Sequence, residues 1–176
     1  NDKATSSRTD ELNALPSSGY TVVEYTTDGD TLHTDTLGNV RLLYINTPES
    51  FGTPEPYGYE AKAYLKELLP EGTTLYYEFD PTGDRVDAYD RALAWLRIGS
   101  PTGPLVQVKV AEQGFIKSYY DFGASLYVVD VETAVAQAMR DGLGLYFLQQ
   151  KEGPYYIRTA QSTNLIANYQ IGRAHV

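Results

Sequence analysis

The chain has 176 residues and a mass of 19.6 kDa, which fits one globular domain of ordinary size. Hydrophobic residues make up 42% and charged residues 21%, so the composition supports a core and excludes a wholly disordered protein. The chain contains no Cys, which excludes disulfides, thiolate metal sites and cysteine nucleophiles. No apolar run approaches the ~18 residues that a membrane-spanning helix needs.

The formal net charge of −9 is unevenly distributed along the chain. Residues 1–90 hold 17 acidic and 6 basic side chains, whereas residues 91–176 hold 6 acidic and 8 basic ones. Taken alone, this charge argues against binding of polyanions through a general basic surface. The acidic first half is either an ordinary solvated surface or, in part, a set of carboxylates that hold a hard cation.

The first residues of the chain are polar, and residue 1 is not Met. We expect residues 1–19 to be a disordered leader or linker. No signal peptide is visible, and we expect a secreted or cell-surface bacterial protein from which that peptide has been removed.

Short runs of β-branched and aromatic residues, separated by Asp-Gly and Gly-Asn turns, predict three strands: Val22–Tyr25, Thr31–Thr34 and Val40–Ile45. Apolar residues at helical spacing then predict a helix over Ala61–Leu69, which Pro70 and Gly72 end. Two further strands are predicted over Thr73–Phe79 and Ala92–Ile98. The expected order is therefore three strands, one helix and two strands.

The second half of the chain is less regular. Leu105–Val110 alternates like a strand, yet the preceding Pro104 and the following Gly114 suit a short helix. Asp130 is predicted to be the N-cap of a helix that ends near Arg140. Residues 147–176 form an extension without clear periodicity, in which Tyr155–Ile157 is compatible with one more strand.

Three segments carry side chains suited to phosphate chemistry, at residues 28–31, 41–49 and 87–91. Asp30 opens one predicted strand, and Asn46, Thr47 and Glu49 follow the end of another, so a hairpin can bring them together. Side-chain oxygens, a backbone carbonyl and waters would then suit Ca²⁺, which takes several oxygen ligands in loose geometry.

Arg41 and Arg91 add two guanidinium groups, which bind phosphate oxygens in a bidentate manner. A Glu near a metal and two arginines is able to act as general base on a water. These groups together suit phosphodiester hydrolysis. Each part alone also has an ordinary structural explanation: Asp-Gly-Asp as a turn, an Arg on a strand as a surface residue, and Thr-Pro-Glu as the start of a loop.

Together, in this order and spacing, the motifs resemble the staphylococcal nuclease (thermonuclease-like) family over roughly residues 20–146. The motifs are Asp28-Gly29-Asp30-Thr31, then Arg41-Leu42 with Thr47-Pro48-Glu49, then Tyr57-Gly58-Tyr59-Glu60-Ala61, and Asp87, Tyr89 and Arg91. The resemblance implies an α+β fold that consists mainly of β-strands: an OB-type five-stranded barrel with about three helices. It also favours a helix at Leu105–Val110.

The resemblance implies a role for each site residue. Asp30, Asn46 and Thr47 would bind Ca²⁺, Thr47 through its backbone carbonyl. Glu49 would be the general base, and Arg41 and Arg91 would hold the scissile phosphate. Substrate would further contact Tyr89, Tyr120 and Phe122, the last two by stacking on a base.

The implied activity is Ca²⁺-dependent hydrolysis of DNA and RNA to 3′-phosphate and 5′-hydroxyl products, with little sequence preference, by a monomer. Two departures from the family pattern weaken that expectation. Asn46 stands where the family has a second Ca²⁺-binding Asp, so Ca²⁺ affinity should be lower. Ala88 stands where some members have a phosphate-binding Lys, so nucleic-acid binding should be weaker and less dependent on salt.

Two other functions are compatible with the sequence. The first is a nuclease-like OB module that binds nucleic acid or a protein but does not cleave nucleic acid. The second is a surface domain whose acidic face binds a basic partner. The presence of Asp30, Arg41, Glu49 and Arg91 favours the enzyme, whereas Asn46 favours the inactive module.

Overall fold

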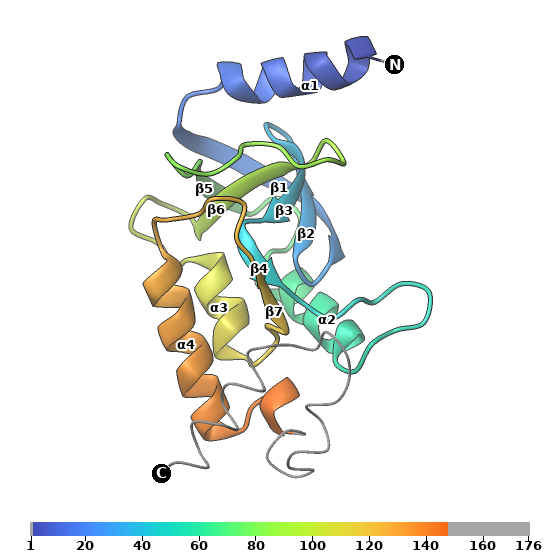
Figure 1. Ribbon diagram of the computed structural model, residues 1–176, viewed down its shortest axis with the longest axis vertical. Helices are drawn as coiled ribbons and strands as arrows, with labels where there is room; N and C mark the ends of the chain where they lie inside the picture. The colour runs from blue at the N-terminus through green and yellow to red at the C-terminus, as the bar shows by residue number, and fades with distance from the viewer. Residues whose placement is uncertain (1, 148–176) are drawn as a thin grey trace.

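Five strands close into a barrel in the order β1, β2, β3, β6 and β5 (Figure 1). In this computed structural model, residues 2–147 are described. The elements in chain order are α1 (Asp2–Ala14), β1 (Ser18–Asp28), β2 (Thr31–Thr34), β3 (Gly38–Leu42), β4 (Tyr44–Asn46), α2 (Gly58–Leu68), β5 (Thr74–Glu78), β6 (Ala92–Ile98), α3 (Val106–Glu112), β7 (Ser118–Tyr120) and α4 (Val128–Asp141). The predicted α+β fold with a five-stranded OB-type barrel is confirmed.

The strand register brings distant motifs to one place on the barrel. β3 pairs antiparallel with β2 and parallel with β6, and Arg41 lies opposite Thr31 on one side and Leu93 on the other. Asp30 immediately precedes β2 and Arg91 immediately precedes β6. The register therefore sets Asp30 and Arg91 on the two sides of Arg41.

The predicted strand Val40–Ile45 is wrong as a single element, because the chain turns sharply between β3 and β4. Tyr44 has a φ of 77°, a left-handed conformation that breaks a strand at a non-glycine residue. β4 leaves the barrel and pairs with β7 instead. The Tyr44 ring stacks on Tyr119 at 4.7 Å between centroids, and its hydroxyl donates to Glu132. These contacts hold the turn and carry Asn46 away from the barrel wall.

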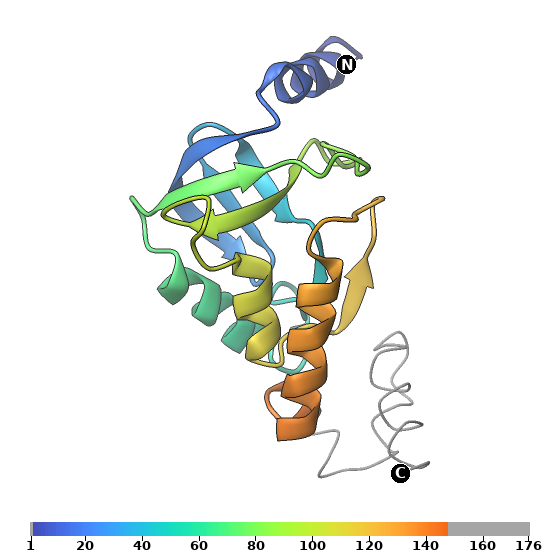
Figure 2. The same cartoon turned by 90° about the vertical axis from the view of Figure 1, so that its left-hand side faces the viewer.

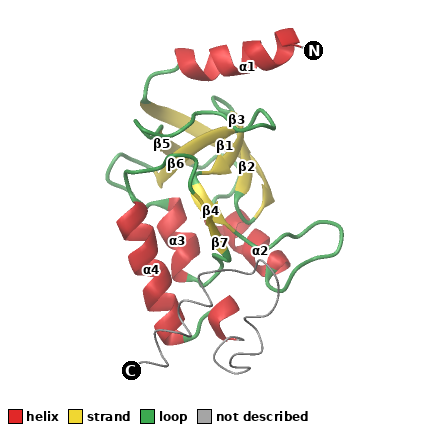
Figure 3. Cartoon of the chain, in the orientation of Figure 1, coloured by secondary structure: helices red, strands yellow, loops and turns green. Residues whose placement is uncertain are grey.

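The helices divide between the two ends of the barrel (Figures 2 and 3). Helix α1 lies at one end, while α2, α3 and α4 lie at the other. Leu105–Val110 falls mainly in α3, so the helical alternative is confirmed. Helix α4 begins at Val128, not after an Asp130 N-cap, and Asp130 lies in its first turn, where a negative charge suits the helix N-terminus.

Helix α1 replaces the expected unstructured leader at residues 2–14. The segment has few apolar residues and therefore gives little helical periodicity to detect, but one of them, Leu12, is fully buried in the core. The possible strand at Tyr155–Ile157 lies outside the described residues. Within residues 2–147, no helix is both long and apolar enough to cross a membrane.

Candidate active site

A cavity of about 300 Å³ opens where β2, β3, β4 and the segment before β6 meet. All the residues predicted for catalysis, metal binding or substrate contact line it except Thr47, which is fully buried behind Asp30. The lining residues are Asp28, Asp30, Thr31, Arg41, Asn46, Glu49, Asp87, Ala88, Tyr89, Arg91, Tyr120 and Phe122.

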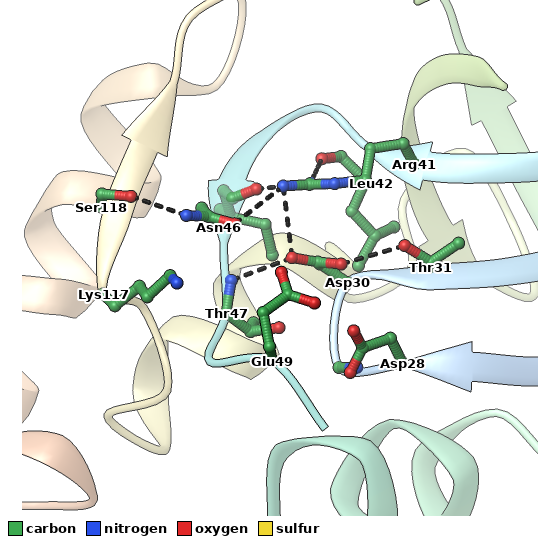
Figure 4. Close-up of polar contacts among 12 residues, drawn as sticks. Asp28, Asp30, Thr31, Arg41, Leu42, Asn46, Thr47, Glu49, Lys117 and Ser118 are labelled. Carbon is green, nitrogen blue, oxygen red and sulfur yellow. Dashed lines mark hydrogen bonds and ion pairs between the residues drawn. The ribbon is translucent and has the colours of Figure 1, made fainter. Parts of the chain in front are cut away.

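Asp30 and Arg41 form a buried ion pair at the floor of this cavity (Figure 4). Arg41 Nη2 lies 3.2 Å from Asp30 Oδ2, which also accepts the Thr47 backbone N–H at 2.9 Å. The Thr31 hydroxyl donates to the other oxygen, Oδ1, at 2.9 Å. Both oxygens of Asp30 therefore have donors, as a buried carboxylate requires.

The turn between β3 and β4 fixes the Arg41 guanidinium. Its Nη1 donates to the backbone carbonyls of Leu42 and Ile45, at 2.9 and 2.6 Å. Both carbonyls face Arg41 Nη1 because the chain bends at Tyr44, which lies between Leu42 and Ile45. On the cavity side, Arg41 Cζ lies 5.0 Å from the centre of the Tyr120 ring. Arg41 thus has a fixed orientation before any substrate is bound.

The Asn46 side chain directs its oxygen toward the Arg41 guanidinium. Its Nδ2 donates to Ser118 Oγ at 2.8 Å, and its Oδ1 accepts from Arg41 Nη2 at 3.1 Å. These two contacts together define the orientation of the amide, with the oxygen facing Arg41 and the nitrogen facing Ser118 on β7 (Figure 4).

Negative charge accumulates around Glu49. Its carboxylate is directed toward Asp30 (Figure 4), and Asp28 lines the same cavity. Partial burial raises the pKa of Glu49, and the charges of Asp28 and Asp30 raise that pKa further. A divalent cation would offset this repulsion.

The oxygen donors here fit a hard cation such as Ca²⁺, although Asp30 is the sole carboxylate among the three predicted ligands. Asp30 and Asn46 would supply side-chain oxygens, and Thr47 would supply a carbonyl. Arg41 already places positive charge on Asp30. Within residues 2–147, no group of three or more His, Cys, Asp or Glu side chains has the arrangement of a metal site. This donor set predicts weak binding of the cation.

Asp87 positions Arg91, and both residues line the same cavity. Arg91 Nε donates to Asp87 Oδ2 at 2.8 Å, and Asp87 Oδ1 accepts the backbone N–H groups of Tyr89 and Arg91 at 2.9 and 3.0 Å. Arg91 Cζ lies 5.3 Å from the centre of the Tyr89 ring. One carboxylate, whose side chain is only 3% exposed, thus organises the whole turn.

Three aromatic side chains line the cavity and are available for stacking. Tyr89 is 79% exposed and Tyr120 is 45% exposed. Tyr120 meets Phe122 edge to face, with ring centres 5.7 Å apart.

Asp28, Asp87 and Ser118 had no predicted role. Asp28 and Asp87 stand within the motifs at residues 28–31 and 87–91, and this position in the sequence could have indicated them. Ser118 had no such indication, because its place opposite Asn46 depends on the pairing of β4 with β7.

A comparison with protein families agrees with this geometry. The family model described as Staphylococcal nuclease homologue matches residues 39–147. The match covers more than half of the chain and includes β3 from its second residue, every later element from β4 to α4, and the cavity residues from Arg41 onward. The chain belongs to the family of staphylococcal nuclease homologues.

Proposed function

We propose that the protein is a Ca²⁺-dependent nuclease that hydrolyses DNA and RNA with little sequence preference. The observation that carries the proposal is that one cavity brings Glu49 together with Arg41 and Arg91. A carboxylate base beside two fixed guanidinium groups suits attack of water on a phosphodiester.

In the proposed reaction Glu49 accepts a proton from the attacking water while the oxygen of that water forms a bond to phosphorus. The bond from phosphorus to the 5′-oxygen breaks, and that oxygen takes a proton from solvent, which leaves a 3′-phosphate and a 5′-hydroxyl. Arg41 and Arg91 stabilise the negative charge that grows on the phosphate oxygens. Ca²⁺, held by Asp30, Asn46 and the Thr47 carbonyl, would supply further positive charge to the phosphate.

The low sequence preference follows from the kinds of side chain available for the substrate. Tyr120 and Phe122 offer ring faces and edges, and every base has a π-face on which to stack. The arginines contact phosphate, which is the same at every position of a strand.

A second candidate function is a nuclease-like module that binds nucleic acid without cleaving it. The observation in its favour is that Arg41 pairs with Asp30 and Asn46, two of the predicted metal ligands. Asn46 adds no negative charge, so Asp30 is the one charged residue among the predicted ligands. The positive charge of Arg41 already balances part of the charge of Asp30, as a bound cation would.

End-labelled single-stranded DNA and RNA, incubated with millimolar CaCl₂ or with EGTA, separate the two functions. The enzyme should give fragments only with Ca²⁺, and phosphatase treatment should change their mobility by removing a 3′-phosphate. Binding in a fluorescence anisotropy assay without any Ca²⁺-dependent fragments would support the inactive module.

A further inference from the structure

Helix α1 contacts the segment before β6, which carries four of the cavity residues: Asp87, Ala88, Tyr89 and Arg91. Arg8, in the middle of α1, donates through Nε to the backbone carbonyl of Asp90 at 3.2 Å. Its Nη2 donates to the carbonyl of Leu37, in the turn between β2 and β3. Asp90 lies between Tyr89 and Arg91, which both line the cavity. A side chain far away in the sequence thus reaches the backbone of the site.

The turn between β2 and β3 is shaped to receive this guanidinium. Gly38 has a φ of 69°, and a Cβ at this position would lie 2.9 Å from Arg8 Nη2. A side chain here would therefore be strained by its backbone and would also press on Arg8. Arg8 itself is only 20% exposed.

A reciprocal contact joins α1 to the same segment from the other direction. Arg85 Nη1 donates to the carbonyls of Leu12 and Leu15, at 3.1 and 3.0 Å. Leu12 is fully buried, and Arg85 Cζ lies 4.4 Å from the centre of the Phe79 ring. Helix α1 is thus tied to the segment before β6 at two places, through Arg85 and through Asp90.

Asp90 gives the turn of residues 87–91 its left-handed bend. Its φ is 61°, a conformation that Asp and Asn adopt more readily than other non-glycine residues. The same turn sets the N–H groups of Tyr89 and Arg91 toward Asp87. A contact that holds the Asp90 carbonyl therefore holds the whole turn formed by residues 87–91.

We infer that α1 is a positioning element for the site, in which Arg8 holds the turn of residues 87–91 and so fixes Arg91 and Tyr89 for the substrate. The inference rests on the proposed function for its effect on catalysis, but not for its effect on the turn. Arg8 is a positioning residue, since the contacts that define its role are to backbone carbonyls.

The test compares wild type with Arg8→Ala, Arg8→Lys and Glu11→Gln in the full chain. Glu11 is 65% exposed and pairs with Arg8 at 3.7 Å, so Glu11→Gln removes the ion pair but leaves both carbonyl contacts. Amide exchange at Tyr89 and Arg91, followed by NMR without substrate, should be roughly tenfold faster in Arg8→Ala, the scale of one lost charged hydrogen bond. Arg8→Lys, which keeps the charge and one donor direction, should fall between, and Glu11→Gln should match wild type.

Hydrolysis of single-stranded DNA supplies the second readout. In Arg8→Ala the kcat should fall several-fold with a smaller change in KM, since Arg91 acts on charge that develops in the transition state. Unchanged exchange at Tyr89 and Arg91 would overturn the inference. So would an equal rise throughout β5 and β6, because Arg8 would then stabilise the barrel as a whole. A wild type that cleaves nothing would refute the proposed function, while the exchange comparison would still decide whether Arg8 holds the turn.

Discussion

Asn46 shows how one side chain changes the chemistry expected of a site. Its amide oxygen lies where a carboxylate is expected, and Arg41 and Ser118 use both ends of the amide. The oxygen remains a possible ligand, but the negative charge is gone. The negative charge of Asp30 is already balanced in part by Arg41.

Asn46→Asp is therefore expected to tighten Ca²⁺ binding by about tenfold or more, because an added ligand charge raises affinity in oxygen-ligand sites. The Ser118 hydroxyl is able to turn and donate to the new carboxylate, so the side chain keeps a partner on β7. Isothermal calorimetry of wild type and variant gives the two dissociation constants.

The matched control is Asn39→Asp, which adds the same charge at an exposed position near the start of β3, beside His33 and outside the cavity. An Asn46→Asp protein with the affinity of this control would show that residue 46 is not a ligand.

At the scale of elements, the buried Asp80 joins three parts of the chain. Its oxygens accept from the Thr82 backbone after β5, from the Trp95 indole on β6, and from the backbone N–H groups of Ser125 and Leu126 before α4. Burial alone would raise the pKa of Asp80, but these hydrogen bonds outweigh it and hold the pKa well below its usual range.

Asp80→Asn should destabilise the protein by about 3 kcal/mol at pH 7, because the variant loses a charge and turns an amide N–H₂ toward donors. Urea denaturation measures this difference. Since the folded pKa lies below the unfolded value of 3.8, the contribution of the charge is present above that pH and is lost as the pH falls below it. The gap between wild type and variant should accordingly narrow below pH 3.8.

Asp84→Asn is the control, since Asp84 is exposed in the same connection. A gap that stays constant down to pH 2, or a similar loss in Asp84→Asn, would contradict the role given to Asp80.

The elements that the sequence predicted well are those with strong local patterns. Strands β1, β2 and β5 stand out as runs rich in β-branched and aromatic residues, and α2 repeats its apolar residues at helical spacing, so the positions of these elements follow from local sequence. The break at Tyr44 and the strand β7 depend on tertiary contacts, namely the stacking of Tyr44 on Tyr119. Helix α1 depends on Leu12 and two arginine contacts, which no local pattern reveals.

The same division applies to the candidate site. Arg41, Glu49 and Arg91 stand in recognisable motifs, and the structure gathers them in one cavity. The groups that fix their orientation were harder to predict, because Ser118 and Arg8 act from segments far away in the sequence.

At the scale of the whole molecule, the net charge of −9 limits binding to a polyanion. A cavity with two arginines is able to hold a phosphate without a basic surface around it. Few phosphate contacts predict modest affinity and a shallow dependence on salt.

Ala88→Lys should raise affinity for single-stranded DNA and make the slope of log K against log salt more negative by about 0.7, the value for one added phosphate contact. Ala88 is exposed at the cavity rim, next to Tyr89. Fluorescence anisotropy over a range of salt concentrations gives the slope.

Ala63→Lys adds the same charge on the exposed face of α2 and controls for a general effect. Equal slopes in the two variants would mean that phosphate does not pass beside residue 88.

The proposed function requires Glu49 to act as the base of a Ca²⁺-dependent nuclease. The most direct measurement is the single-turnover cleavage rate of single-stranded DNA with saturating Ca²⁺ in wild type, Glu49→Gln and Glu67→Gln, the last a change on the exposed face of α2. Glu49→Gln should cleave at least about 10²-fold more slowly than wild type, and Glu67→Gln should match wild type. A wild type that cleaves no faster than Glu49→Gln would contradict this role of Glu49.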